Sequence, residues 1–117
     1  MRARAFSGKI NGLGLQRRFE SDSYIDPRLV ISPKASVRNL RVLYDGGESV
    51  GGDPWSGWAL AEFDWDGSPA VGARWNGDER GVGNPQSRGV ATWFVLPGPL
   101  AEVARESLGD RPKGRPI

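Results

Sequence analysis

The sequence predicts an α+β protein that is mainly β, with one C-terminal helix and a small curled antiparallel sheet or partly open barrel of about 5–7 strands. Three observations predict this class. Short stretches of alternating apolar and polar residues follow one another along the chain, and turn-forming Gly, Pro, Asn and Asp residues separate them. Only the region after Pro97 shows the 3.6-residue period of a helix. We expect residues 1–109 to form one β-rich domain, with residues 1–12 unassigned, and residues 110–117 to form a disordered basic tail.

The strongest strand pattern lies in residues 57–66, which carry apolar side chains on both faces. Asp66-Gly67-Ser68 then supplies a hairpin turn, because Gly tolerates the positive φ that such turns demand. The next strand is therefore expected to pair antiparallel with the first, which would set Arg74 opposite or diagonal to Glu62 or Asp64 as an ion pair. The predicted strands are residues 13–20, 28–32, 37–44, 57–66, 69–76 and 89–96.

Within the predicted strand 37–44, period-two alternation places Leu40, Val42 and Tyr44 on one face. The strand 89–96 is apolar on both faces, which is typical of a central strand. Pro97-Gly98-Pro99 then ends the sheet and begins the helix, because proline is favoured in a first helical turn. The predicted inward stripe of this helix is Leu100, Val103, Ala104 and Leu108, and Gly109 is the predicted stop.

The composition excludes several kinds of chemistry. The chain has no cysteine and no histidine, so it has no thiolate nucleophile, no Cys or His metal ligand and no imidazole base. We therefore predict a non-enzymatic protein without a cofactor or metal, and a histidine-free enzyme is the second alternative. No stretch approaches the roughly 20 apolar residues of a membrane span, and the expectation is a soluble cytoplasmic protein with no membrane partner.

Charge is distributed unevenly although the formal net charge is only +2. Residues 1–41 carry nine Lys or Arg against three Asp or Glu, residues 42–79 carry one against eight, and residues 80–117 carry six against three. Basic ends around an acidic middle are consistent with an anion-binding face, since clustered Lys and Arg form the electrostatic footprint of nucleic-acid binding. The alternative is that the three segments neutralise one another in the folded protein.

The stretch from Arg74 to Pro97 is the candidate binding surface, because a polar loop is held there between two aromatic strands. Its Gly81-Val82-Gly83 segment superficially resembles a phosphate cradle. No Lys-Ser/Thr pair follows and the chain continues into a strand, so a long hairpin connection is favoured over a nucleotide site. The carboxylates of Glu62, Asp64 and Asp66 are similarly interpreted as a solvated strand face in preference to a Mg²⁺ site.

Arginine and aromatic side chains interleave in this stretch, as in proteins that stack nucleic-acid bases on rings and bind phosphates with guanidinium groups. We therefore predict a small binding module for nucleic acid or another acidic partner. The competing interpretation makes Trp75 and Trp93 core residues. The predicted ligand-binding residues are Arg74, Trp75, Asn76, Arg80, Asn84, Gln86, Ser87, Arg88 and Trp93.

A second class of function is a protein-interaction or regulatory subunit, either an immunity-like protein or a homodimer. In that case exposed Trp55, Trp58 or Trp93 would form an apolar patch. The pattern of Arg74-Trp75-Asn76-Gly77 followed by the Gly/Asn/Pro loop and Thr92-Trp93-Phe94 resembles small bacterial accessory proteins carried by plasmids, phages or gene cassettes. This resemblance names no family and implies no activity.

Overall fold

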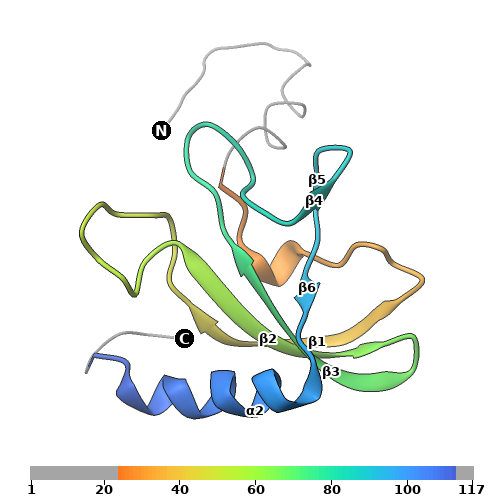
Figure 1. Ribbon diagram of the computed structural model, residues 1–117. Coiled ribbons are helices and arrows are strands. Elements are labelled where there is room, and N and C mark those ends of the chain that lie inside the picture. Colours follow the sequence, from red (N-terminus) through yellow and green to blue (C-terminus); the bar gives the residue numbers. More distant parts are fainter. Residues whose placement is uncertain (1–23, 113–117) are drawn as a thin grey trace.

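A computed structural model describes residues 24–112 and shows a mainly β protein with one C-terminal helix (Figure 1). Four strands form an open antiparallel sheet in the order β1-β2-β3-β6, and β4 and β5 form a separate two-stranded ribbon. The predicted fold class is thus confirmed in its coarse form, although the described strands do not close into a barrel. The strands are β1 (Val37–Asp45), β2 (Trp58–Trp65), β3 (Ser68–Trp75), β4 (Gln86–Ser87), β5 (Val90–Ala91) and β6 (Phe94–Val95).

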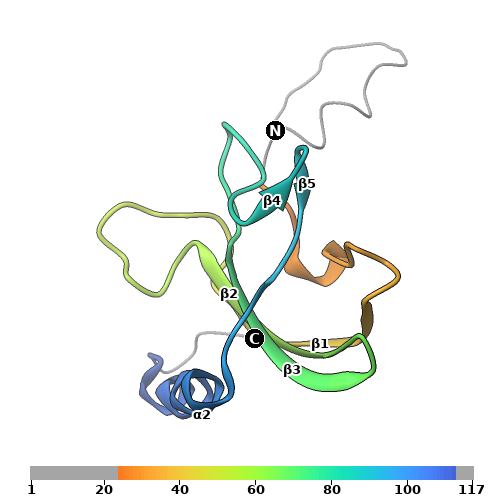
Figure 2. The same ribbon diagram turned by 45° about the vertical axis from the view of Figure 1, so that its right-hand side comes forward.

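The helix α2 (Gly98–Ser107) lies across one face of the sheet, and the loop between β3 and β6 rises on the other side (Figure 2). Two short 3₁₀ helices, η1 (Pro27–Leu29) and η2 (Leu108–Asp110), complete the described chain. The strand predicted for residues 13–20 and the end of the predicted tail, residues 113–117, lie outside the described residues.

The hairpin of β2 and β3 is the part of the fold that the sequence predicts best. Trp65 lies opposite Ser68, so Asp66 and Gly67 form a two-residue turn, and both have a positive φ, 51° and 88°. This is the geometry that favours glycine in tight hairpins. The register also corrects one prediction, because Arg74 lies opposite Ala59 and forms no ion pair with the carboxylates of β2.

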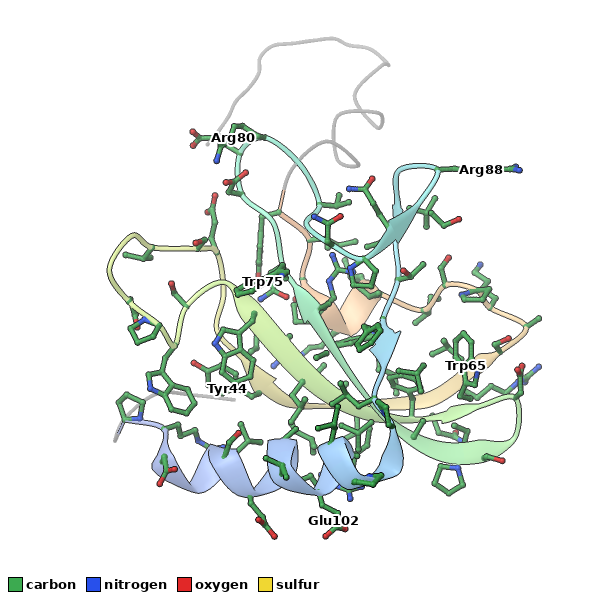
Figure 3. All side chains as sticks on the ribbon, in the orientation of Figure 1. Tyr44, Trp65, Trp75, Arg80, Arg88 and Glu102 are labelled. Atoms are coloured by element: carbon green, nitrogen blue, oxygen red, sulfur yellow. The ribbon has the colours of Figure 1, made fainter. Side chains whose placement is uncertain are left out.

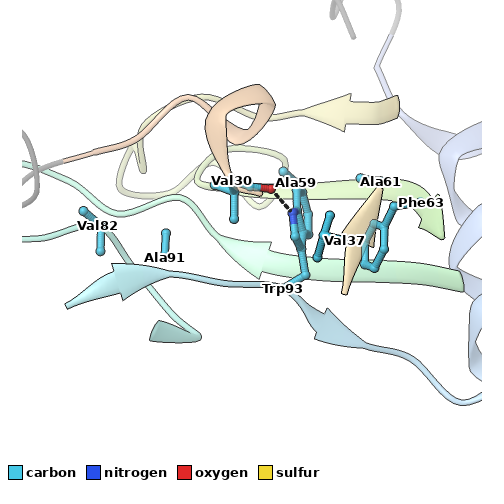
Figure 4. Packing of buried hydrophobic residues seen from close by; sticks show 8 residues of the cluster. All are labelled: Val30, Val37, Ala59, Ala61, Phe63, Val82, Ala91 and Trp93. Atoms are coloured by element: carbon cyan, nitrogen blue, oxygen red, sulfur yellow. Dashed lines mark hydrogen bonds between the residues drawn. The ribbon is translucent and has the colours of Figure 1, made fainter. Parts of the chain in front are cut away.

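Strand β2 is buried on both faces, as its alternation predicts. Ala59, Ala61 and Phe63 point to the core on the side away from the helix, which is drawn in Figure 4. There the Phe63 ring packs against Trp93 with ring centroids 5.8 Å apart, and the Trp93 Nε1–H donates a hydrogen bond to the carbonyl of Val30 at 2.8 Å. This core fastens the segment before β1 and the segment before β6 onto the same face of the sheet.

The helix side of the sheet has its own core, and β1 contributes to it through a bulge. Val42 pairs with Ala61, but Tyr44 pairs with Leu60, so one extra residue lies between the two pairs. A bulge of this kind shifts the following side chain to the opposite face. Tyr44 is therefore buried beneath the helix, against the ring of Trp58, and the prediction that it shares a face with Val42 is wrong.

Two predicted strands are also corrected. In the predicted strand 28–32, Arg28 and Leu29 belong to the 3₁₀ helix η1, because Asp26 caps the turn by accepting a hydrogen bond from the Arg28 N–H at 2.9 Å. None of residues 28–32 lies in a named strand. The predicted strand 89–96 is divided into β5 and β6, since Trp93 turns inward to the core between them. Strand β6 consequently lies at an edge of the sheet and is not central.

The helix α2 begins directly after Pro97, as predicted, but its buried stripe differs from the prediction. Ala101 is buried and Ala104 and Leu108 pack beside it, whereas Leu100 and Val103 are exposed. The two alanines pack in the same core as Val71 of the sheet, so Leu100 and Val103 lie on the part of the helix that faces away from it.

Glu62 connects this helix to the sheet and provides a pH-dependent contact. Its Oε2 accepts a hydrogen bond from the Arg105 Nε at 3.0 Å, and its Oε1 pairs with the guanidinium of Arg41. Partial burial acts to raise the pKa of Glu62, but the hydrogen bonds and positive charges of the two arginines outweigh it and hold the pKa below its ordinary value.

A carboxyl group with a lowered pKa contributes stability at neutral pH that is lost as the pH falls through that pKa. We expect Glu62→Gln to lower the free energy of unfolding by about 1 kcal/mol at neutral pH, and this deficit to vanish in acid. Urea denaturation of both proteins between neutral pH and acid measures the difference. Glu106→Gln, which removes an exposed helix carboxylate without an ion pair in the described structure, should show no such dependence. A deficit that persists in acid would contradict the assignment.

Candidate functional site

The loop between β3 and β6 is held in place by the buried side chain of Arg74. This side chain is only 4% exposed, and its Nη1 donates hydrogen bonds to the carbonyls of Pro85, at 3.2 Å, and of Thr92. Its Nη2 donates to the carbonyl of Val82. Burial lowers the pKa of Arg74 to about 10, so the group still carries its charge at neutral pH. Within residues 24–112 it has no carboxylate partner, and it acts as a clamp on three carbonyls of one loop.

A close backbone crossing explains two glycines of this loop, Gly77 and Gly83. The loop returns on itself so that the Trp75 N–H donates to the Asn84 carbonyl at 2.7 Å. A Cβ on Gly83 would lie 2.0 Å from the Trp75 carbonyl oxygen and 2.5 Å from the nitrogen of Gly77. Both glycines also have a positive φ, 90° at Gly77 and 79° at Gly83. Only glycine fits such a crossing without displacing the backbone. The crossing therefore accounts for these two glycines, and a bound phosphate is not needed to explain them.

Asn76 and Trp93, two more of the predicted ligand-binding residues, are also buried. The Asn76 Nδ2 donates to the carbonyl of Gly47 at 2.9 Å and so connects the end of β3 to the loop after β1. Its Oδ1 has no hydrogen-bond partner within the described part of the chain. The Trp93 ring lies in the core beside Phe63. Neither side chain offers a free surface to a ligand, so for Trp93 the core interpretation is the one that the structure supports.

The two exposed arginines of the loop differ in their surroundings. Arg80 is paired with Asp78, which accepts from the Arg80 backbone N–H at 2.8 Å and from its Nη2 at 3.1 Å. The side-chain hydrogen bond to Asp78 and the negative charge of that carboxylate raise the pKa of Arg80. Arg88 lies at the turn between β4 and β5, where its side chain extends from the end of the ribbon (Figure 3). It forms no ion pair or hydrogen bond with the described residues, and Ser87 beside it is exposed.

An aromatic groove of about 540 Å³ opens where α2 leaves the helix side of the sheet uncovered. Two of its rings are exposed to an unusual degree, Trp75 at 61% and Phe94 at 58%, and Figure 3 shows Trp75 at the upper end of β3. Phe94 pairs with Ala73, whose small side chain leaves the hollow between the larger ones. The groove is lined by Pro54, Trp58, Ala73, Arg74, Trp75, Asn84, Pro85 and Phe94.

The predicted ligand-binding residues therefore lie in different parts of the structure and do not form one surface. Trp75, Asn84 and Arg74 line the groove, whereas Gln86, Ser87 and Arg88 belong to the β4–β5 ribbon. The Gln86 Nε2 donates to the Gly83 carbonyl at 2.9 Å, which leaves its side chain close to the loop. The predicted ligand-binding residues do not include five residues of the groove. Ala73, Pro85 and Phe94 are direct neighbours of predicted residues in the chain, whereas Pro54 and Trp58 come from the β1–β2 connection and the start of β2.

One signal in the sequence pointed to the groove. The alternation of β3 places Ala73 and Trp75 on the same face as Val71, and the helix that follows β6 is only ten residues long. At 1.5 Å per residue, a helix of that length covers only part of such a face. An uncovered aromatic end of the sheet could have been inferred from these two facts.

Trp55 and Trp58, which were candidates for an exposed patch, are half-buried and pack on Tyr44. The ring centroids of Tyr44 and Trp55 are 5.6 Å apart, and the Trp58 Nε1–H donates to the Pro54 carbonyl at 3.0 Å. Trp58 presents one side of its ring to the groove. Among the tryptophans of the described chain, Trp75 is the one that is mainly exposed.

The carboxylates do not form a metal site in the part of the chain that the structure describes, where no three acidic side chains converge. Asp64 instead accepts a hydrogen bond from the Asn39 Nδ2 at 2.8 Å. Between residues 24 and 112 there is also no helix with the length and apolar character needed to cross a membrane. Comparison with protein-family models, curated proteins and solved structures gives no match to this chain.

Proposed function

We propose that the protein is a non-enzymatic binding module whose aromatic groove holds an extended segment of a partner protein. The observation that carries this proposal is the pair of rings of Trp75 and Phe94, both more than half exposed on the walls of one concave surface. Large aromatic side chains are normally buried, and their exposure in a groove is typical of an interaction site. The volume of the groove lies within the range of ordinary ligand pockets.

The chemistry of the lining favours a neutral, apolar segment that contains proline or aromatic residues. Prolines and tryptophans lie side by side in the groove, which is the composition that binds polyproline-type segments in known recognition modes. The only ionised side chain in the lining is Arg74, and its Nη atoms are hydrogen-bonded to loop carbonyls. Because this guanidinium is only 4% exposed, a phosphate in the groove could make little contact with it, so the groove itself suits a peptide better than a nucleic acid.

The same lining supports a binding role in preference to catalysis. It contains no carboxylate, hydroxyl or amine group that could act as a nucleophile or general base. Its one amide side chain, Asn84, is suited to a hydrogen bond with a peptide backbone.

Selection of random linear peptides displayed on phage against the full chain tests this function. We expect selected peptides to share proline and aromatic positions, and Trp75→Ala combined with Phe94→Ala to weaken their affinity at least about tenfold, as calorimetry would measure. Both side chains are mainly exposed, so the thermal midpoint of the double variant should change little. Val90→Ala, which removes an exposed apolar side chain outside the groove, is the matched control and should bind normally.

Other occupants of the groove would give different results. A concentration-dependent dimer in light scattering, abolished by Trp75→Ala, would assign the groove to a second copy of the chain. Equal affinity of the double variant and the wild type for the selected peptides would refute the proposed site.

A further inference from the structure

The floor of the aromatic groove has a hollow because one alanine lies there among large side chains. In the register of the sheet, Ala73 lies directly between Leu60 of β2 and Phe94 of β6. Trp75 follows two positions along β3, and therefore on the same face, where it lies opposite Trp58. Neighbouring strands are about 4.8 Å apart, so the side chains on the two sides of Ala73 are about 10 Å apart. The space above the alanine methyl group therefore has the width of one ring of a ligand.

Three backbone carbonyls of the groove lining already accept hydrogen bonds within the protein. The Pro54 carbonyl accepts from the Trp58 Nε1–H at 3.0 Å, and the Asn84 carbonyl accepts from the Trp75 N–H at 2.7 Å. The Pro85 carbonyl accepts from a backbone N–H of the same loop at 3.0 Å. A ligand residue whose backbone N–H is buried against these carbonyls would lose its hydrogen bond to water without an equivalent replacement. Proline avoids this cost because it has no N–H.

The lining also disfavours a charged side chain in the hollow. Its only ionised group is the guanidinium of Arg74, which is 4% exposed and whose Nη atoms donate to loop carbonyls. A charged ligand residue would therefore leave water without gaining an ion-pair partner. An aromatic residue is neutral but brings a backbone N–H, so charge and hydrogen bonding together favour proline. The exposed Asn84 side chain can donate its Nδ2–H to a carbonyl beside this proline.

We propose that Ala73 determines the specificity of the groove, and that the hollow above it takes the ring of one proline in the partner segment. This inference rests on the proposed peptide-binding function and narrows it, because proline becomes a requirement at one position of the segment. The rings of Trp75 and Phe94 pack against the pyrrolidine ring from the two walls. A larger residue in place of Ala73 would fill the hollow from below and exclude the proline.

Calorimetry with the full chain and a peptide obtained by the phage selection tests the requirement for proline. Replacing the required proline of the peptide by alanine removes the ring and adds an N–H, so binding should weaken at least about tenfold. N-Methylalanine at the same position lacks the N–H, and its peptide should bind within about threefold of the proline peptide. Selected peptides that share no proline, or an N-methylalanine peptide as weak as the alanine peptide, would overturn the inference.

Ala73→Leu tests the hollow from the side of the protein. Because Ala73 is only partly buried and lines an open groove, we expect the thermal midpoint to change by less than about 4 °C. The affinity for the proline peptide should fall at least about tenfold, and the proline and alanine peptides should then bind within about twofold of each other. Ala70→Leu is the matched control, because it is the same substitution on β3 at a residue that packs on the other core and does not line the groove. It should bind both peptides as the wild type does.

Two outcomes distinguish this inference from the function on which it rests. If no selected peptide requires Trp75 and Phe94 for binding, both are refuted. If selected peptides require these two rings but bind Ala73→Leu as tightly as the wild type, the proposed function is retained and only the role of Ala73 is overturned.

Discussion

Replacing Arg74 with alanine is expected to lower the free energy of unfolding by about 3–5 kcal/mol, one of the two largest effects that we expect from a single substitution. The guanidinium donates to three carbonyls that belong to three separated positions of the loop, Val82, Pro85 and Thr92. Removing it leaves these acceptors without their donor and opens a space beneath the loop. For a small domain, whose total stability is about 5–15 kcal/mol, such a loss is severe.

Lysine should not perform the structural role of Arg74. A single ammonium group cannot reproduce the planar guanidinium, whose two Nη atoms donate hydrogen bonds to separate carbonyls of the loop. We expect Arg74→Lys to recover less than half of the lost stability. Urea denaturation measures the stabilities, and hydrogen exchange should show faster exchange in residues 76–92 before the rest of the chain unfolds. Arg41→Ala, which removes an arginine that is exposed and paired only at the surface, should cost less than about 1 kcal/mol. Similar losses for the Arg41 and Arg74 alanine variants would show that the clamp does not stabilise the loop.

The sequence predicts the centre of the fold because local signals and the final packing agree there. In β2, period-two alternation places Ala59 and Phe63 on one face and Leu60 on the other, and this is how the two cores are filled. Asp66-Gly67 has both the composition and the backbone angles of a tight hairpin turn. Where hydrophobic alternation, turn composition and tertiary packing all favour the same structure, that structure can be predicted from a single sequence.

Prediction from the sequence fails where contacts with residues distant in the chain determine the local conformation. Nothing near Tyr44 indicates the bulge that moves it to the helix side, since the bulge is selected by the burial of its ring against Trp58. The apolar run before Pro97 has the composition of one strand, but the hydrogen bond from Trp93 to Val30, 63 residues away in the chain, divides it in two. Such tertiary contacts override local propensity.

The candidate site was predicted as one surface and is in fact distributed over several environments. Trp75 and Asn84 do lie together, because the loop returns to β3 at that point. The arginine expected to face a ligand, Arg74, instead supports the loop from within. A sequence shows that an arginine is present, but its role depends on whether carbonyls or solvent surround it.

The second large effect is expected for Gly83→Ala, which should lower the free energy of unfolding by at least about 3 kcal/mol. A methyl group at this position would meet the Trp75 carbonyl oxygen at 2.0 Å and would also occupy the left-handed region of φ. The backbone segments at Gly83 and Trp75, which cross here, would have to move away from each other. Asn84 and Pro85 would move with them, so peptide binding in the groove should be lost together with stability.

Gly81→Ala is the control for this prediction, because it changes the other glycine of the same Gly-Val-Gly segment. No atom lies within 4 Å of a Cβ at Gly81, and its φ is not positive, so we expect its stability to change by less than about 0.5 kcal/mol. Thermal denaturation and the soluble yield of both variants give the comparison. A phosphate cradle would require both glycines for close approach to a ligand, whereas a backbone crossing requires only the one that touches Trp75. Equal tolerance of alanine at the two positions would contradict the crossing.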